Sequence, residues 1–197
     1  MRYDAEHKQK TRERVLKAAA RAIRADGPHK IGVAAVMAEA GLTHGGFYAH
    51  FGSKDDFIAA AVGQMFEEGR SRLDRAMDER PPGRGLATYV DFYLSAGHRD
   101  TRTAGCPLPF LSADAPRLAA PSRERFAQGV ADLTDRLAQV LTELGRADPE
   151  ETAGSMLSEM VGAVALARAE PDPARSDAIL ERTRASLKRR LDLEPVQ

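Results

Sequence analysis

Residues 40–54 read AGLTHGGFYAHFGSK, and this stretch connects two segments that both have helical periodicity. In the segment before it, apolar residues recur at positions i, i+3, i+4 and i+7, which predicts a helix over about residues 33–40. Gly41 ends that helix at a position that suits a left-handed backbone. Thr43 is a good N-cap for a following helix over about residues 44–51. The stretch therefore predicts two short helices joined by a tight turn.

The two predicted helices match the helix–turn–helix pattern, in which the second helix enters the major groove of DNA while the first braces it. The groove is about 12 Å wide, which is enough for one helix. Phe47 and Phe51 are four residues apart, so they share one face of the second helix and are expected to hold it against the protein. The opposite face carries only small or polar groups, as a surface that meets DNA requires.

This stretch resembles the matching region of the tetracycline-repressor (TetR) family of bacterial transcriptional regulators. The family pattern reads Ala-Gly-apolar-Ser/Thr, three variable positions, then apolar-Tyr-x-His/Tyr-Phe-x-x-Lys. The earlier segment RVLKAA, residues 14–19, and the pair Asp26-Gly27 fit the family as well. The resemblance implies an all-α fold of about nine helices, with a helix–turn–helix DNA-binding domain over residues 1–53. It also implies a helical ligand-binding and dimerisation domain over residues 54–197.

The resemblance gives each matched residue of the second helix and its flanks a role. The residues that it places against base edges are His44, Gly45, Gly46 and Ala49. The residues that it places against phosphates are Thr43, Tyr48, His50 and Lys54, and the positive N-terminus of the next helix would assist Lys54. The residues themselves leave alternatives open: Tyr48 as a half-buried core aromatic, and His50 and Lys54 as solvated surface side chains.

Two features depart from the family pattern. Gly32 stands where relatives often place Ser or Thr, so the first of the two helices begins without a hydroxyl for a phosphate. Each glycine of the Gly45-Gly46 pair costs about 1 kcal/mol relative to alanine in a helix interior, but the pair allows the backbone to approach DNA closely. His44 is the side chain here that can read a base edge directly, so we expect His44→Ala to change the base preference of the binding site. An unchanged preference in a selection from random DNA would contradict this expectation.

The charge is unevenly distributed along the chain. Lysine plus arginine and aspartate plus glutamate both number 29, so the formal net charge is zero. The first 55 residues nevertheless hold ten basic and six acidic side chains and carry +4, which leaves −4 on the remainder. A basic first quarter predicts an anionic partner for that part alone, although chance scatter is the alternative explanation.

Several classes of protein are disfavoured. The single cysteine excludes an intrachain disulfide, and no apolar run is long enough for a transmembrane helix. The charged N-terminus lacks a signal region, so a soluble, cytoplasmic protein is expected, without a membrane partner. No catalytic triad spacing, metal-ligand pair or phosphate-binding glycine loop is present, so neither an enzyme, a cofactor nor a metal site is expected. A purely structural helical bundle is the other rival, and it leaves the basic first quarter unexplained.

The remaining residues contain a further series of amphipathic segments. They predict helices over about residues 8–25, 54–78, 86–98, 106–113, 121–144, 148–169 and 173–191. A homodimer is expected, because one short helix reads only a few base pairs and two copies read a palindromic operator. The interface is predicted on the last two helices, where an apolar band is interrupted by Gly154 and Gly162; an intramolecular core is the alternative. The band consists of Met156, Leu157, Met160, Val161, Val164 and Leu166.

A small-molecule effector is expected among the helices of the second domain. The candidate ligand-binding residues are bulky, adaptable and mostly apolar: Met65, Phe66, Phe92, Tyr93, Phe110 and Met160. Cys106 precedes a predicted helix whose dipole would favour the thiolate, which permits a redox- or electrophile-sensing regulator; a small buried residue is the alternative. The function expected from the resemblance is a repressor that releases its operator when the effector binds.

Overall fold

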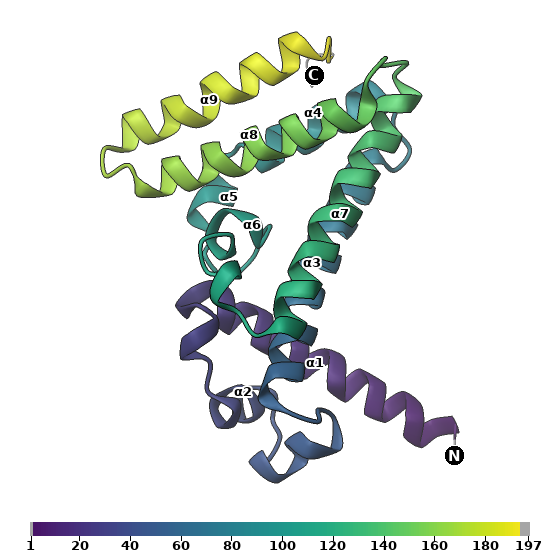
Figure 1. Ribbon diagram of the computed structural model, residues 1–197, viewed down its shortest axis with the longest axis vertical. Coiled ribbons are helices and arrows are strands. Elements are labelled where there is room, and N and C mark those ends of the chain that lie inside the picture. The colour runs from purple at the N-terminus through teal and green to yellow at the C-terminus, as the bar shows by residue number, and fades with distance from the viewer. Residues whose placement is uncertain (1, 194–197) are drawn as a thin grey trace.

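The computed structural model describes residues 2–193, with side chains from residue 6 onward, and it contains helices and no strands over that range (Figure 1). The α-helices of this range are α1 (Arg2–Asp26), α2 (Val33–Glu39), α3 (Lys54–Met77), α4 (Pro82–Tyr93), α5 (Ala96–Asp100), α6 (Leu108–Leu111), α7 (Ala120–Glu143), α8 (Pro149–Ala169) and α9 (Pro173–Arg190). The short 3-10 helices are η1 (Pro28–Lys30), η2 (His44–Ala49) and η3 (Ala115–Arg117). The predicted all-α fold is confirmed. None of the helices within residues 2–193 has the length and apolar character needed to cross a membrane.

The helices begin where local sequence signals favour a start. Pro82 and Pro149 open α4 and α8, where the missing N–H of proline costs nothing. Ser53 caps α3, because its hydroxyl accepts a hydrogen bond from the backbone N–H of Asp56 at 3.0 Å. The predicted serine cap of that helix is therefore confirmed.

The helix predicted over residues 86–98 is wrong, because two helices occupy that region. α4 ends at Tyr93 and α5 begins at Ala96. Ser95 lies between them, and its hydroxyl accepts a hydrogen bond from the backbone N–H of His98 at 3.1 Å. A serine that caps a new helix in this way ends the preceding one. The helix predicted over residues 106–113 is also shorter and covers only α6.

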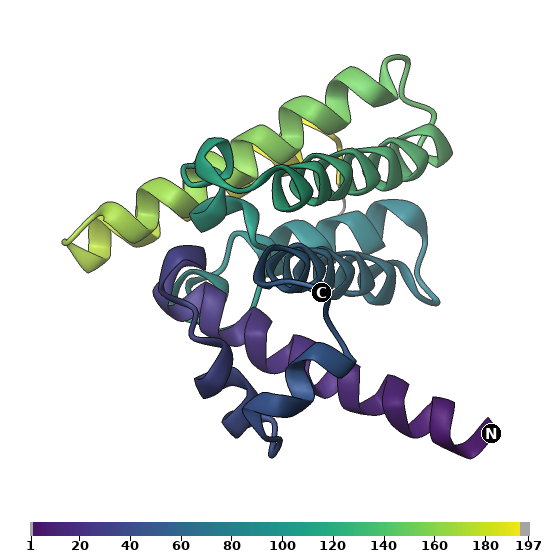
Figure 2. The same ribbon diagram turned by 60° about the horizontal axis from the view of Figure 1, so that its bottom comes forward.

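The first helices form a small head at one end of the molecule. It comprises α1, α2 and η2, and the N-terminal end of α1 projects away from the rest of the fold (Figures 1 and 2). The apolar stripe that the sequence places on α1 is buried, including Val15, Leu16, Ala19 and Ile23. Burial of this stripe fixes α1 against the other helices of the head and leaves basic side chains such as Lys17 and Arg21 on the surface, whereas Arg24 is buried.

The body consists mainly of long helices that lie side by side. α3 packs along α7, and α8 and α9 form a pair at the far end from the head (Figure 1). Gly129 of α7 permits the close approach to α3, because a Cβ atom at this position would lie 2.2 Å from the ring of Phe66. The Phe66 ring in turn meets the ring of Phe126 edge-on, with centroids 5.5 Å apart.

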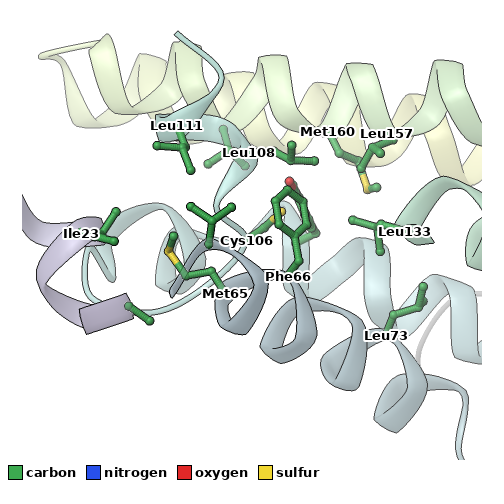
Figure 3. Packing of buried hydrophobic residues seen from close by; sticks show 14 of the residues in the cluster. Ile23, Met65, Phe66, Leu73, Cys106, Leu108, Leu111, Leu133, Leu157 and Met160 are labelled. Atoms are coloured by element: carbon green, nitrogen blue, oxygen red, sulfur yellow. The ribbon is translucent and has the colours of Figure 1, made fainter. Parts of the chain in front are cut away.

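One continuous core joins the head to the body. The same cluster of buried residues includes Ile23 of α1, Met65 of α3, Leu111 of α6 and Met160 of α8 (Figure 3). The domain boundary expected after residue 53 stays a prediction, and it lies directly before Lys54, the first residue of α3. Packing across this boundary mechanically connects the head with the long helices of the body.

Most of the apolar band expected at a dimer interface lies inside the protomer. Met156, Leu157, Met160 and Val164 are buried against other helices of the same chain, so the intramolecular alternative is correct for these four residues. Leu166 differs from them, because 64% of its surface is exposed.

Candidate nucleic-acid interface

The turn between α2 and η2 has the geometry of a helix C-terminus closed by a left-handed glycine. Gly41 has a φ of 71°, and the backbone N–H of Leu42 donates to the carbonyl oxygen of Met37 at 2.9 Å. This six-residue closure satisfies a carbonyl that the end of α2 would otherwise leave without a partner. The predicted turn is confirmed, and it fixes the direction in which η2 leaves α2.

The second helix of the pair is tighter than the sequence predicts. η2 is a 3-10 helix over His44–Ala49 rather than an α-helix over residues 44–51. The Thr43 side chain makes no capping hydrogen bond, so Thr43 marks the start without stabilising it through its hydroxyl. The adjacent Gly45-Gly46 pair has poor helix propensity, which is consistent with a short 3-10 segment in place of a longer helix.

Three phenylalanine rings hold η2 against the head. The rings of Phe47 and Phe51 lie 5.4 Å apart, and the ring of Phe57 from α3 meets them at 5.5 Å and 4.8 Å. All three side chains are buried. The anchoring role predicted for Phe47 and Phe51 is confirmed, whereas Phe57 was not predicted although it lies at the first buried position of α3.

The side of η2 opposite these rings faces outward. Tyr48 is 71% exposed, so the alternative in which it is a half-buried core residue is wrong. Exposed positions also include Thr43, His44, Gly45 and Ala49, and Lys54 is exposed at the start of α3. Gly46 and His50 are partly covered. The structure therefore brings the predicted DNA-contacting residues together on and beside one short helix.

Helix α1 adds two basic residues that the motif does not contain. The guanidinium of Arg12 lies over the ring of Phe51, 5.1 Å from its centroid. Burial, followed by the positive charges of Lys8 and Arg12, lowers the pKa of His50 below its ordinary value. The Nδ1 atom of His50 is enclosed and has no hydrogen-bond partner among the described residues. Lys8 and Arg12 thus extend the basic surface beyond η2. The sequence signal that could have indicated this is their i, i+4 spacing, which places both residues on one face of α1.

This arrangement of an anchored short helix with a polar outer face matches a known family. A family model described as "Bacterial regulatory proteins, tetR family" matches residues 15–61. The chain is similar to the TetR family over these residues. The Bacillus subtilis (strain 168) "Uncharacterized HTH-type transcriptional regulator YfiR" is 27% identical over 105 residues, which cover 53% of this chain and 51% of that protein. The match thus spans about half the length of this curated relative.

Solved structures of TetR-family regulators share the fold along nearly the whole chain. A TetR-family transcriptional regulator from Streptomyces coelicolor has a TM-score of 0.75 at 23% identity, covering 95% of this chain and 97% of its own. The reduced form of E. coli NemR has a TM-score of 0.79 at 22% identity, and the match covers 91% of this chain and 96% of the NemR chain. A TetR regulator from Chloroflexus aurantiacus J-10-FL has a TM-score of 0.77 at 23% identity, covering 96% and 98%.

The candidate ligand residues do not all line one cavity. Met65, Phe66 and Met160 are buried in the core, and Phe110 is half-buried at its edge. Phe92 and Tyr93 do lie together, because both line a small cavity between α3, α4 and the loop that carries Cys106. The sequence analysis missed polar residues that line this cavity, Glu68 and Arg72 among them, because it considered bulky, mostly apolar side chains as ligand contacts.

Cys106 is buried, and its surroundings oppose the thiolate. Burial raises the pKa of the thiol above its ordinary value. Helix α6 begins only at Leu108 and has four residues, so it supplies little of the dipole that was expected to favour the thiolate. The prediction of a stabilised thiolate is wrong for this protein.

Proposed function

We propose that this TetR-family protein binds double-stranded DNA and represses transcription until a small molecule binds its body. The single observation that carries the proposal is the outer face of η2, which is exposed and polar while its inner face is buried by three aromatic rings. Base contacts are assigned to His44, Gly45, Gly46 and Ala49. Phosphate contacts are assigned to Thr43, Tyr48, His50 and Lys54, with residues 1–53 as the DNA-binding domain and 54–197 as the effector and dimerisation domain.

We infer further that the protein acts as a homodimer. A single η2 of six residues reads only a few base pairs, and two copies about one DNA turn apart would add their binding energies. The outer face of α8 supports this arrangement. Leu166 is a large apolar side chain exposed on α8 of the single protomer, and Val161 is half-buried on the same helix.

A gel-shift and footprinting experiment on the DNA upstream of the protein's own gene tests the proposal. We expect a footprint with two-fold symmetry, and an affinity that falls steeply with salt as phosphate contacts release counterions. An enzyme or a structural bundle predicts no such footprint. Absence of binding to these fragments at low ionic strength would overturn the proposal.

The DNA affinity is expected to depend on pH through His50. Burial and the charges of Lys8 and Arg12 lower the pKa of this ring in the free protein, so it is mostly neutral at neutral pH. A phosphate beside the ring would favour the imidazolium and raise its pKa in the complex. The resulting gain in affinity is complete below the pKa of the free protein and is lost as the pH rises through the pKa of the complex.

Fluorescence anisotropy at constant ionic strength measures this dependence. Between about pH 7.5 and about pH 6 we expect the affinity of the wild type to increase about two- to tenfold more than that of His50→Gln. His44 is present in both proteins, so the difference between them isolates His50. Equal pH profiles would show that no phosphate meets His50.

The second candidate function is a redox- or electrophile-sensing regulator that acts through Cys106. The likeness in fold to the reduced form of E. coli NemR favours it, whereas the burial of the thiol and its raised pKa oppose it. We expect iodoacetamide to modify Cys106 much more slowly in the folded protein than in urea, because the thiolate is the reactive form. We also expect Cys106→Ala to keep the DNA affinity within about twofold of the wild type, because Cys106 is buried in the body, away from the outer face of η2. Rapid alkylation of the folded protein together with loss of DNA binding would reverse this ranking.

A further inference from the structure

The junction of head and body contains an ion pair between α1 and α3 in which the arginine is buried and the glutamate is partly exposed. The Nη2 atom of Arg24 donates to the Oε2 atom of Glu68 at 2.7 Å, and only 2% of the Arg24 side chain is exposed. The other carboxylate oxygen of Glu68 accepts from the Nε2 atom of Gln64 at 3.2 Å. Both oxygens of Glu68 are therefore occupied, and its charge is balanced by Arg24.

Two more arginines surround the same region without an acidic partner of their own. The guanidinium of Arg72 stacks on the ring of Phe92 at 4.3 Å from its centroid, and Arg168 donates to the carbonyl oxygens of Arg99 and His98 at 2.9 Å and 3.0 Å. Among the described residues, no carboxylate forms an ion pair with either guanidinium. Arg24 and Arg72 thus face one glutamate, Glu68, while Arg168 lies near Asp100, so positive charge is in excess beside Glu68.

A neighbouring histidine shows the effect of this charge. His98 is buried and accepts a hydrogen bond from the backbone N–H of Cys106 at its Nε2 atom, and its Nδ1 atom lies 2.7 Å from the carbonyl oxygen of Tyr93. Burial, and then the charges of Arg168, Arg72 and Arg24, lower the pKa of His98 to about 4. The ring is therefore neutral, with its proton on Nδ1, and it does not add to the positive charge.

A polar group without a partner lies in the same place. The hydroxyl oxygen of Tyr93 is fully buried and has no hydrogen-bond partner of ordinary geometry among the described residues. The thiol of Cys106 lies beside it, and a thiol is only a weak acceptor. Tyr93, Arg72 and Phe92 all line a cavity of about 20 Å³, which has room for roughly one water molecule.

We propose that this cavity binds the carboxylate of a small organic acid, which accepts hydrogen bonds from the hydroxyl of Tyr93 and the guanidinium of Arg72. This inference rests on the proposed function, because it identifies the chemical class of the effector. A carboxylate supplies both the missing acceptor and the missing negative charge, and charge-assisted hydrogen bonds of this kind are among the stronger ones. The half-buried side chain of Arg72 closes the cavity from one side, and its rotation would make room for the body of the ligand beside Phe92 and Tyr89.

The position of Glu68 connects this site with the DNA-binding head. Glu68 lines the cavity and also holds Arg24 of α1, so a carboxylate bound beside it repels the carboxylate of Glu68. Weakening of the pair leaves the charge of Arg24 buried without compensation, which is strongly unfavourable. The contact between α1 and α3 then rearranges, and the DNA affinity falls.

Two acids, each paired with its uncharged amide, test the site directly. We expect benzoate or acetate to raise the melting temperature of the wild type saturably beyond the effect of benzamide or acetamide. The same acid should lower the DNA affinity by about tenfold, which is within the usual range of coupling between sites. Arg72→Gln should bind the acid at least about tenfold more weakly. Arg75→Gln removes the same charge from α3 at an exposed position outside the cavity and should bind the acid as the wild type does.

Two further variants separate binding of the acid from its effect on DNA affinity. Tyr93→Phe removes the unpaired hydroxyl, so it should keep or raise the melting temperature while weakening the response to the acid. Glu68→Gln should still bind the acid but lose the effect of the acid on DNA affinity. The inference is overturned when neither acid exceeds its amide, or when Arg72→Gln and Arg75→Gln respond alike. Binding of an acid by a protein that ignores DNA would overturn the proposed function alone, and DNA binding without any response to acids would overturn this inference alone.

Discussion

Phe47→Ala is expected to lower the free energy of unfolding by about 3–5 kcal/mol, the usual cost of removing a buried phenylalanine ring. The ring of Phe47 packs against those of Phe51 and Phe57, so its loss leaves a cavity at the centre of the head. The same change releases η2 from α3, and we expect DNA binding at the native site to be lost. Urea unfolding followed by circular dichroism, with fluorescence anisotropy for DNA, measures both effects.

Tyr48→Ala is the matched control for Phe47→Ala. Tyr48 is adjacent in the sequence but exposed, so its removal should change the free energy of unfolding by no more than about 0.5 kcal/mol. It should still weaken DNA binding about tenfold, because the phenol would no longer contact a phosphate. If Phe47→Ala unfolds as the wild type does, η2 is not held by its aromatic ring. If Tyr48→Ala keeps full DNA affinity, the outer face of η2 is not the binding surface.

Gly129→Ala is expected to destabilise the protein although alanine is the better helix former. The helical preference favours alanine by about 1 kcal/mol. A Cβ atom at this position would, however, lie 2.2–2.5 Å from ring carbons of Phe66, and that ring is itself held against Phe126. Overpacking of this kind typically costs about 1–3 kcal/mol, and contacts this short favour the upper part of that range. We therefore expect a net loss of about 1–2 kcal/mol in chemical denaturation.

Gly63→Ala provides the comparison for this prediction. Gly63 lies on α3, and a Cβ atom there would meet only the Cδ atom of the Arg125 side chain, at 3.9 Å. The helical preference then acts alone, and we expect a gain of up to about 1 kcal/mol. A stabilising Gly129→Ala would show that α3 and α7 can separate without cost.

The sequence predicted the parts of the fold that depend on neighbours along the chain. Gly41 adopts the left-handed backbone expected of it, Ser53 caps α3, and Phe47 and Phe51 share the buried face of η2. Each of these features is determined by a few adjacent residues, through backbone sterics, a capping hydroxyl or helical spacing. The exposed outer face of η2 could be predicted for the same reason.

The sequence could not predict features that depend on residues distant along the chain. The pair of Arg24 with Glu68 joins positions 44 residues apart, and nothing in either segment indicates the other. The four-residue α6 depends on the buried loop around Cys106, where Gly105 has a φ of 98° and lies against the ring of His98. The sequence analysis placed the ligand among apolar residues, because Glu68 and Arg72 look like ordinary surface residues of an amphipathic helix. Their partners, Arg24 of α1 and Phe92 of α4, are distant along the chain.

The length of α3 has a mechanical consequence. This helix carries Lys54 at its first residue and Glu68 fourteen residues later, which at 1.5 Å per residue separates them by about 21 Å. A rigid rod that pivots at Glu68 by roughly 5° would sweep its tip through about 2 Å. In a dimer, the two α3 helices would pivot in opposite directions, and the distance between the two heads would change by about twice that amount. Binding of one carboxylate beside Glu68 would thereby change the distance between the two η2 helices, so that they no longer match the spacing of successive major grooves.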